Sequence, residues 1–447
     1  MKKHILNYFL AFLFVAFTGS LKAQETSKQE VILITNANVF DGKSDQLSTG
    51  MSVLIEGNKI SKIAKSITAP KGATVIDAKG NTLSPGLMDV HTHLTWNLGP
   101  SGMFNAQSDY LAALSLVEAK ATLMRGFTSV RDVSGEVSGI RSAIDQGLFV
   151  GPRIWTSGAG ISMTGGHGDM RTPSTLPRQM GGPDMTEVEH MGLSIFADGE
   201  TEVLNAARIQ FRNGANLLKM YVGGAVSGVY DPLDIVEYSF EEINAAASEA
   251  KRWGTYLAVH AYTDQAIQQA LEAGAMSIEH ATLITESTAK MISEKGAFLS
   301  TQTGVYLGEA PDDWSEDQKA KQLAAKNGLT SMFELAKKYN LKIALGTDLV
   351  GSPVLKDAQK FELTNRLKWF TPVEILKQAT VNNGEVLAMS GPRNPYPGKL
   401  GVIEEGALAD ILLVKGNLLE DLTLLNNPEV NLLLIIKDGE IYKNIIN

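Results

Sequence analysis

Between about residues 87 and 389, short apolar runs alternate with longer amphipathic stretches. Apolar runs of this length, bounded by polar residues, are typical of buried parallel strands, and amphipathic stretches are typical of helices. Eight strand–helix units in roughly 300 residues predict an α/β fold, a closed (β/α)8 TIM barrel. The eight predicted strands are GLMDVHTHL, FTSVRDV, PRIWTSG, NLLKMYV, TYLAVHAY, MSIEHA, AFLSTQT and KIALGTD.

Two helix starts carry a recognisable capping pattern. Ser239 with Glu242, and Thr371 with Glu374, place a hydroxyl and a carboxylate three residues apart, as in a capping box. Pro372 follows Thr371 at a first helical position, where its missing N–H costs nothing. Both pairs predict that a helix begins there.

The two ends of the chain have a different texture, with short strands joined by turns. VILITNANVF, SVLIEGNKISKIA and ATVIDAKGN precede the barrel, and ADILLVKGN and LLLIIKDGEIYK follow it. Two all-β pieces at opposite ends can pair into one small domain. We therefore predict a β-sandwich built from residues 33–86 and 390–447, beside a barrel formed by residues 87–389.

The first residues are typical of an export signal. Lys2 and Lys3 precede an apolar run from Ile5 to Phe17, and small and polar residues follow as far as Ala23. This order predicts a signal peptide over residues 1–23, cleaved after Ala23 and followed by a polar linker over 24–32. About 13 apolar residues fall short of the roughly 20 that a membrane-spanning helix needs, so we expect no stable membrane anchoring. The protein is then periplasmic or secreted.

Composition narrows the chemistry. The 447 residues contain no cysteine, which excludes disulfides, thiol nucleophiles and thiolate metal ligands. Loss of Lys2, Lys3 and Lys22 with the signal peptide changes the formal net charge from −9 to −12. An acidic chain is a poor partner for nucleic acid, so we expect a small molecule or short peptide as substrate.

Histidines gather where a barrel builds its active site. Four of the six that remain after export lie at or near the carboxyl ends of predicted strands 1, 5 and 6. His91 and His93 form a His-x-His pair, and a spacing of two places both imidazoles on one face of a strand. The pair can reach one metal ion, although alone it could also be a polar strand end.

Lys219 lies inside the apolar run LLKMYV of the fourth predicted strand. Burial disfavours the charged form and lowers the pKa of a lysine. Lys219 either points outward or pairs with a carboxylate, or it is neutral, nucleophilic and converted into a group that binds metal.

Three further ligand candidates end the later strands. His260 ends the fifth, His280 ends the sixth, and Asp348 ends the eighth in the segment LGTD. A carboxylate at the barrel mouth can bind a metal and also handle a proton. Imidazole and carboxylate together suit Zn²⁺ or a similar divalent ion.

The order His-x-His, Lys, His, His, Asp on strands 1, 4, 5, 6 and 8 resembles the amidohydrolase superfamily in its two-metal form. The segments SPGLMDVHTHL, GANLLKMYVGG and ALADILLVKGNLLEDL strengthen the likeness, which covers nearly all of the chain after about residue 33. GISMTGGHGD and VHAYTDQAI are similar to the imidazolonepropionase-like branch, which contains Xaa-Pro and Xaa-Arg/Lys dipeptidases. Asp264 and Ala281 depart from that branch's usual proline and glycine.

The resemblance implies a ligand set and a reaction. His91, His93 and Asp348 would hold one divalent ion, His260 and His280 the other, and a carboxylated Lys219 would bridge them. A hydroxide shared by the two ions would attack an amide (peptide) bond of a dipeptide or N-acyl amino acid. Asp348 would take the hydroxide proton and pass it to the leaving nitrogen.

Three residues outside the ligand set are candidates for substrate contact. His167 lies among glycines on the loop after the third strand, where it could contact the substrate or the developing oxyanion, or be a surface histidine. The resemblance implies that Tyr262 helps to hold a substrate carboxylate. Tyr221 either lines the pocket or packs in the core.

Two minor expectations concern neighbouring groups. Arg131 and Asp132 end the second predicted strand, where they would form an ion pair that shapes the site or serves structure alone. His190 has no such setting and is expected to be structural or exposed.

Two alternative functions stay open. A cyclic amide, lactone or organophosphate hydrolase could use the same metal centre, because specificity resides in loops rather than ligands. A secreted binding protein without catalysis is disfavoured because all six ligand positions are filled. Members of the superfamily often form dimers or larger assemblies, which admits a homo-oligomer here.

Overall fold

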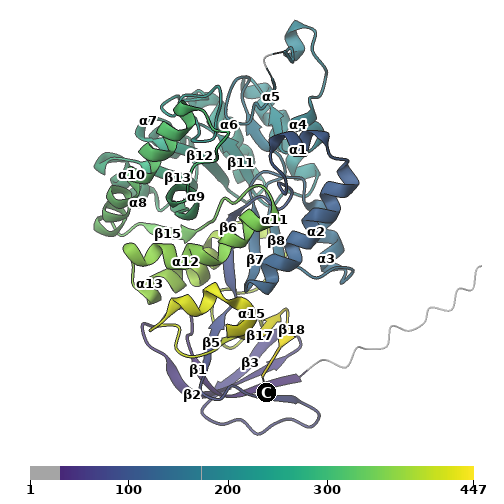
Figure 1. Cartoon of the computed structure of the whole chain (residues 1–447), viewed down its shortest axis with the longest axis vertical. Coiled ribbons are helices and arrows are strands. Elements are labelled where there is room, and N and C mark those ends of the chain that lie inside the picture. The colour runs from purple at the N-terminus through teal and green to yellow at the C-terminus, as the bar shows by residue number, and fades with distance from the viewer. Residues whose placement is uncertain (1–30, 173, 447) are drawn as a thin grey trace, which may run out of the picture.

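A computed structural model describes residues 31–172 and 174–446. The signal peptide predicted at residues 1–23 and the linker up to residue 30 lie outside the described residues. The first strand begins at Val31, two residues before the predicted start of the sheet domain. Figure 1 shows a helix-covered barrel standing on a smaller sheet domain, in which the described N-terminal strand and the C-terminus both lie.

The barrel contains all eight predicted strands. Two additional three-residue strands, β9 (Gly160–Ser162) and β10 (Ser194–Phe196), lie between the third and fourth of them. The eight are β6 (Leu87–Thr92), β7 (Phe127–Asp132), β8 (Arg153–Thr156), β11 (Leu218–Tyr221), β12 (Leu257–Thr263), β13 (Ser277–Leu283), β14 (Phe298–Thr301) and β15 (Lys342–Leu345).

The strands form two parallel ladders, β6-β7-β8 and β10-β9-β11-β12-β13-β14-β15. Contacts between the first and last barrel strands bring the ladders together. The amide of Asp348, just after β15, donates to the carbonyl of His91 in β6 at 2.8 Å. A Cβ at Gly346 would lie 2.5 Å from the Cβ of His91, so only glycine permits this close approach.

Helices cover the outside of the barrel (Figure 1). Both predicted capping boxes are confirmed: Ser239 caps α6 and Thr371 caps α13, which has Pro372 in its first turn. The helices are α1 (Pro100–Asn105), α2 (Ser108–Met124), α3 (Ser138–Asp145), α4 (Glu187–His190), α5 (Glu200–Arg212), α6 (Phe240–Arg252), α7 (Asp264–Ala273), α8 (Glu286–Lys295), α9 (Gly304–Leu307), α10 (Glu316–Lys338), α11 (Pro353–Lys356), α12 (Glu362–Asn365), α13 (Pro372–Lys377), α14 (Asn383–Ala388) and α15 (Pro428–Asn431).

The sheet domain combines both chain ends, as predicted. Its strands form one hydrogen-bonded sheet, β18-β17-β16-β5-β1-β2-β3, and β4 pairs with the first half of β1. The sheet thus branches at β1 and surrounds one apolar core drawn from both ends of the chain. Its strands are β1 (Val31–Val39), β2 (Ser48–Glu56), β3 (Lys59–Ala64), β4 (Thr74–Asp77), β5 (Thr82–Pro85), β16 (Ile411–Val414), β17 (Leu432–Lys437) and β18 (Glu440–Asn444).

A charged cluster joins the two domains. Arg153, at the start of β8, donates to both carboxylate oxygens of Asp410 at 2.9 and 3.0 Å and to Asp438 at 2.7 Å. Arg153 and Asp410 are buried. The pairing therefore fixes the amino end of the barrel to the sheet domain.

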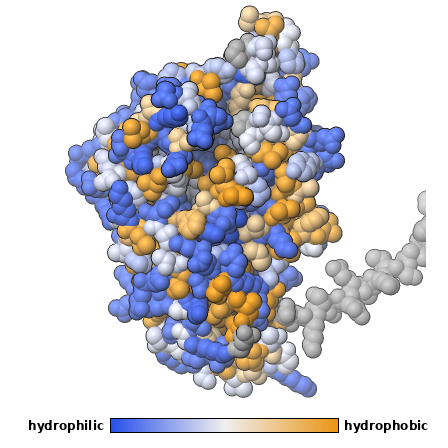
Figure 2. All heavy atoms as spheres, viewed as in Figure 1, coloured by the Kyte–Doolittle hydropathy of each residue, from blue (hydrophilic) through white to orange (hydrophobic). Residues whose placement is uncertain are grey.

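The surface is mixed in character. Figure 2 shows hydrophilic and hydrophobic side chains interspersed over the barrel, with hydrophobic ones gathered on part of the sheet domain. Within residues 31–172 and 174–446, no helix combines the length and the apolar character needed to cross a bilayer.

Candidate metal centre and active site

The six predicted ligand residues converge at the carboxyl ends of the barrel strands. Five of the six are buried, and Asp348 is partly exposed. Neighbouring imidazole rings have centroids 4.3 to 5.3 Å apart. The six are His91 in β6, His93 directly after β6, Lys219 in β11, His260 in β12, His280 in β13 and Asp348 after β15.

Asp348 lies between the histidines of the first strand. Its Oδ1 atom is 3.0 Å from Nε2 of His93 and 3.3 Å from Nε2 of His91. Candidate ligand atoms of His91, His280 and Asp348 all lie within 4.8 Å of one another. These distances match a set of groups arranged around a small cation.

Lys219 is 1% exposed, and its Nζ atom has no hydrogen-bond partner among the described residues. Burial lowers the pKa of Lys219 to about 8. An appreciable fraction of the amine is therefore neutral at neutral pH, as the addition of CO2 requires. Lys219 therefore does not point outward and makes no hydrogen bond to a carboxylate among the described residues. Its conversion into a group that binds metal stays a prediction.

The histidines also suit a metal. Burial holds the pKa of His260 and of His280 well below the ordinary value, so both rings are neutral. The Nε2 atom of His280 has no partner among the described residues. Neutral imidazoles with a free ring nitrogen are metal ligands, and with the unpaired Lys219 they make this donor set fit a binuclear site.

Backbone strain accompanies the site. His280, Ala281 and Asp348 have φ angles of 74°, 55° and 56°, in the left-handed region. Such conformations are uncommon for residues with a Cβ and concentrate at functional sites. On a regular strand, Glu279 and His280 would point to opposite faces, and the left-handed turn at His280 lets both of them face His91.

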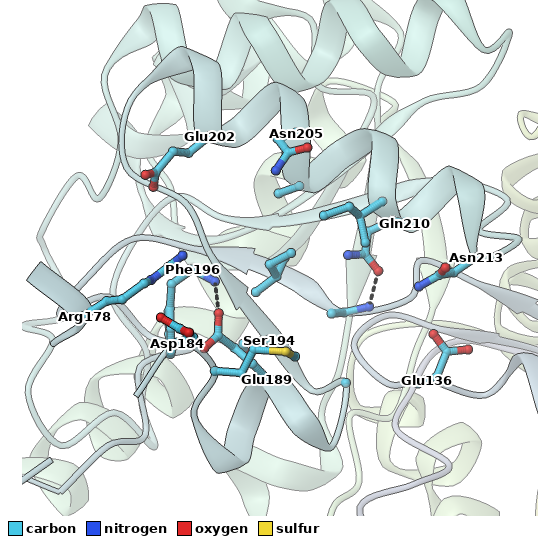
Figure 3. Close-up of a pocket in the computed structure, with 16 residues that line it drawn as sticks. Glu136, Arg178, Asp184, Glu189, Ser194, Phe196, Glu202, Asn205, Gln210 and Asn213 are labelled. Carbon is cyan, nitrogen blue, oxygen red and sulfur yellow. Dashed lines mark hydrogen bonds between the residues drawn. The ribbon is translucent and has the colours of Figure 1, made fainter. Parts of the chain in front are cut away.

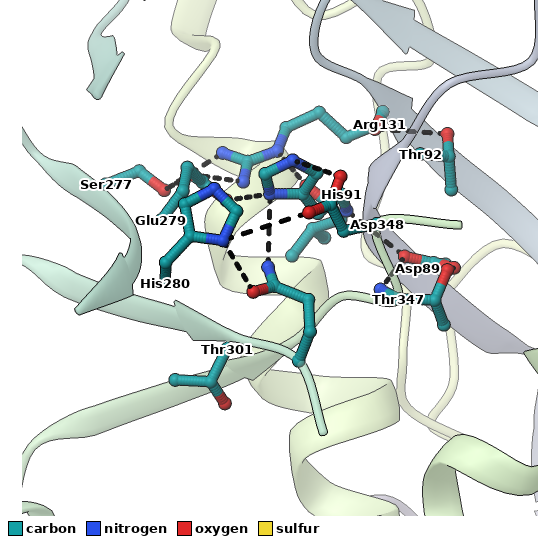
Figure 4. A network of polar contacts seen from close by, with 12 residues as sticks. Asp89, His91, Thr92, Arg131, Ser277, Glu279, His280, Thr301, Thr347 and Asp348 are labelled. Atoms are coloured by element: carbon teal, nitrogen blue, oxygen red, sulfur yellow. Dashed lines mark hydrogen bonds and ion pairs between the residues drawn. The ribbon is translucent and has the colours of Figure 1, made fainter. Parts of the chain in front are cut away.

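Glu279 orients the first ligand histidine (Figure 4). One carboxylate oxygen accepts from Nδ1 of His91 at 2.8 Å, and the other accepts from Nη2 of Arg131 at 2.7 Å and from Ser277 at 2.6 Å. Glu279 and Arg131 are completely buried. With its proton on Nδ1, His91 keeps Nε2 for a metal.

The predicted ion pair between Arg131 and Asp132 is wrong. Adjacent residues on the regular strand β7 point to opposite faces, so Arg131 pairs with Glu279 instead. Asp132 accepts from the amide of Leu94 at 2.6 Å. Both residues therefore support the strands that carry the site.

Asp89 links His91 in β6 to the segment that carries Asp348. Its carboxylate accepts from the amides of His91 and Thr347, each at 3.1 Å, and from the Thr347 hydroxyl at 2.5 Å. Because Thr347 precedes Asp348, this bridge sets the position of Asp348 relative to β6. Asp89 is spaced by two from His91, a signal that could have identified it from the sequence.

His167 lies beside the second ligand group. Its ring stacks on His260, with centroids 4.5 Å apart, and its Nδ1 atom lies 3.6 Å from a carboxylate oxygen of Asp231. Its amide donates to Glu237 at 2.8 Å. The loop histidine therefore belongs to the site and is not a remote surface residue.

The two tyrosines are buried at the same mouth. Tyr221 meets His167 edge-on and donates to the Ser134 hydroxyl at 2.8 Å. Tyr262 stacks on His280, with centroids 4.9 Å apart. His190, in contrast, is exposed at the end of α4 and outside this cluster.

Besides Asp89, three further supporting residues were not predicted: Glu279, Gln302 and Tyr306. Gln302 and Tyr306 both approach Nδ1 of His280 at 3.0 Å. Glu279 could have been suspected as a carboxylate within a strand, next to a ligand histidine. Gln302 and Tyr306 carry no spacing signal, because they follow a strand that has no metal ligand.

One cavity lies away from this cluster. It has a volume of about 420 Å³ and lies on the flank of the barrel, against α5 and β10. Figure 3 shows carboxylates such as Glu136, Asp184 and Glu202 around its rim. None of the six ligand candidates lines it, so its size does not locate the chemistry.

Comparison with known proteins identifies the family to which the chain belongs. The model of the amidohydrolase family matches residues 82–442, so the chain belongs to the amidohydrolase family and is a hydrolase of that family. Ochratoxinase from Aspergillus niger is 28% identical over 438 residues, which cover 94% of this chain and 88% of that protein.

Two solved structures are similar over nearly the whole fold. A prolidase complexed with N-methylphosphonate-L-proline has a TM-score of 0.85 and 30% identity, over 93% of this chain and 100% of that chain. A Xaa-Pro dipeptidase with bound methionine has a TM-score of 0.81 and 30% identity, with the same coverage. The predicted fold and the resemblance to a dipeptidase branch are confirmed.

Proposed function

We propose that the mature protein is an exported, binuclear metal-dependent amidohydrolase that cleaves the amide bond of dipeptides or N-acyl amino acids. One observation carries this proposal: an unpaired, buried Lys219 amine stands within a cluster of histidines and a carboxylate. The similarity to a prolidase, a Xaa-Pro dipeptidase and an ochratoxinase supports amide substrates.

The donor set divides into two groups around Lys219. His91, His93 and Asp348 would hold one ion, and His260 and His280 the other, with carboxylated Lys219 between them. Zn²⁺ suits imidazole and carboxylate ligands. When bound, the two ions supply an activated water and polarise the scissile carbonyl.

Asp348 is the proton carrier in this proposal. Although burial opposes it, the neighbouring His91 and His93 help to hold the pKa of Asp348 well below its usual value, so the group is a carboxylate. It accepts the proton of the attacking water and delivers it to the leaving nitrogen. Protonation matters because an unprotonated amine is a very poor leaving group.

The remaining residues bind and orient the substrate. His167 lies against His260, where it can donate to the carbonyl oxygen as negative charge develops. The Tyr262 hydroxyl would hold the carboxylate of the leaving amino acid, and Tyr221 would form part of the wall. A small or short-peptide substrate suits a site whose residues are buried.

Hydrolysis of a library tests the proposal. Mature, zinc-loaded protein, beginning at residue 24, is assayed against dipeptides and N-acyl amino acids, with Asp348→Asn beside it. Cleavage of a coherent set that is lost in the variant supports the proposal. No cleavage by protein with two verified zinc ions would contradict it and direct attention to cyclic amides, lactones or phosphoesters.

A further inference from the structure

The segment after β14 supplies none of the predicted ligands, yet it is firmly held. The buried carboxylate of Glu362 accepts from the amides of Thr303 and Gly304 at 2.9 and 2.8 Å. Arg366, fully buried and paired with Glu362 at 3.0 Å, donates to the carbonyl of Thr301. A buried ion pair thus fixes this segment against the barrel, which is expected where side chains must be placed accurately.

What the segment places is a pair of polar groups at one metal-ligand candidate. Oε1 of Gln302 and the hydroxyl of Tyr306 each lie 3.0 Å from Nδ1 of His280. The Tyr306 hydroxyl is also 2.9 Å from the hydroxyl of Tyr262. A continuous hydrogen-bonded chain therefore runs from His280 through Tyr306 to Tyr262, and all three residues are buried.

Metal binding at His280 would fix which atom donates in each of these hydrogen bonds. The Nε2 atom of His280 has no partner among the described residues and is the nitrogen left for an ion. The ring proton then resides on Nδ1, so His280 donates to Tyr306 and to Gln302. With its oxygen accepting from His280, Tyr306 donates its own proton to the oxygen of Tyr262.

The proton of Tyr262 is then free for an acceptor in the pocket. A tyrosine hydroxyl is protonated at neutral pH, so each of the two can donate one hydrogen bond as well as accept one. Hydrogen bonds in a chain polarise one another, and each donor strengthens the next. A cation at one end of the chain would therefore make Tyr262 a better donor at the other end.

We propose that Tyr306 is a positioning residue that couples the metal ligand His280 to Tyr262 and aims the Tyr262 hydroxyl proton at the substrate carboxylate. The proposal rests on the proposed function only in taking His280 as a ligand and Tyr262 as the carboxylate contact. It explains why a segment without a ligand is anchored by a buried ion pair.

A fluorine label tests the coupling without turnover. Full-length mature protein carries 3-fluorotyrosine at position 262, and its fluorine resonance is followed while Zn²⁺ is added. We expect the resonance to shift on zinc binding, and to shift much less in Tyr306→Phe although zinc still binds. A resonance that does not respond to zinc, or that shifts equally in Tyr306→Phe, would overturn the proposal.

Tyr238→Phe is a matched control. Tyr238 is also buried, and its hydroxyl donates a hydrogen bond to the carbonyl of Ala197 at 2.8 Å that the substitution removes. Its hydroxyl has no part in the chain through Tyr306, so the zinc-dependent shift should persist. Loss of the shift in this control would assign the effect to general loosening and reject the coupling.

Kinetics give a second, independent measurement. With a cleavable dipeptide, Tyr306→Phe should raise KM about tenfold while kcat changes by less than about threefold, because the lost interaction holds the bound substrate. An unchanged KM would overturn the proposal. Absence of dipeptide cleavage by the wild type would count against the proposed function, while the fluorine shift would still decide the coupling.

Discussion

Two buried polar clusters lie at opposite ends of the barrel and differ in how their charges are satisfied. At the amino end, Arg153 is bonded to Asp410 and Asp438 by its own guanidinium nitrogens. At the carboxyl end, Nζ of Lys219 and Nε2 of His280 have no partner among the described residues.

The difference distinguishes a cluster that stabilises the fold from a cluster that is available for chemistry. Burying a polar group without a partner is unfavourable, so a completed cluster such as that of Arg153 stabilises the fold. An incomplete cluster needs a further explanation, and the proposed cation with a carboxylated lysine would supply one. The unpaired Nζ of Lys219 and Nε2 of His280, together with the histidines and Asp348 around them, point to the barrel mouth as the reactive end.

The largest expected effect is catalytic. Asp348→Asn removes the group that we propose transfers the proton but leaves the shape of the site intact. We expect kcat to fall about 10²- to 10⁴-fold, with most of the metal retained. Steady-state kinetics and metal analysis of one preparation would check this, and undiminished turnover in a metal-loaded variant would refute the role of Asp348.

A substitution in the amino-end cluster should lower the stability of the fold but leave zinc binding unchanged. Arg153→Met leaves Asp410 buried without its cation, and we expect a loss of about 3–5 kcal/mol in the free energy of unfolding. Denaturant unfolding and zinc content would be measured together. If Arg153→Met lost zinc in the folded protein as readily as it lost stability, the division between the two clusters would be wrong.

Replacing Glu279, which orients the ligand candidate His91, should have an intermediate effect. Glu279→Gln keeps the size of the side chain that contacts Nδ1 of His91 but removes its charge. We expect zinc affinity to fall about 10- to 100-fold. Competition with a chelator measures the affinity, with Glu385→Gln as a control, because Glu385 is an exposed glutamate whose one ion-pair partner among the described residues is Lys342. Equal affinities in the two variants would exclude the orienting role of Glu279.

The smallest effect is the pH dependence of the metal-free protein. Lys219 has a pKa of about 8 in the fold against 10.5 ordinarily. Between these values the unfolded chain binds a proton that the folded one does not, so stability rises with pH. Relative to Lys219→Met, the wild type should gain about 1 kcal/mol from pH 7.5 to 9. If the stability of the two proteins changed equally with pH, burial would not lower the pKa of Lys219.

The barrel was predictable because its signals are local. Each of the eight strands is a compact apolar run, and the Ser239 and Thr371 capping boxes mark helix starts by side-chain chemistry alone. The strands β9 and β10 have only three residues each and leave no periodic pattern. The branching of the sheet at β1 depends on long-range pairing that no local pattern encodes.

The convergence of the six candidate ligands was predictable for a similar reason, since a barrel gathers the carboxyl ends of its strands. The contacts that hold the candidate ligands in place could not be predicted. The Arg131–Glu279 pair joins β7 to β13, and the Tyr262–Tyr306 contact joins β12 to α9. Such contacts between distant segments depend on side-chain direction, which the left-handed backbone at His280 changes without any sequence signal.

Metal stoichiometry tests the central claim most directly. Zinc per chain would be measured for the wild type and Lys219→Ala, each reconstituted with Zn²⁺ in the presence of bicarbonate. If the unpaired Lys219 amine becomes the bridging ligand, the wild type holds two zinc ions and the variant holds fewer, with partial recovery when a short carboxylic acid is added. Two firmly bound ions in both proteins, or a single ion in both, would contradict the assignment of Lys219.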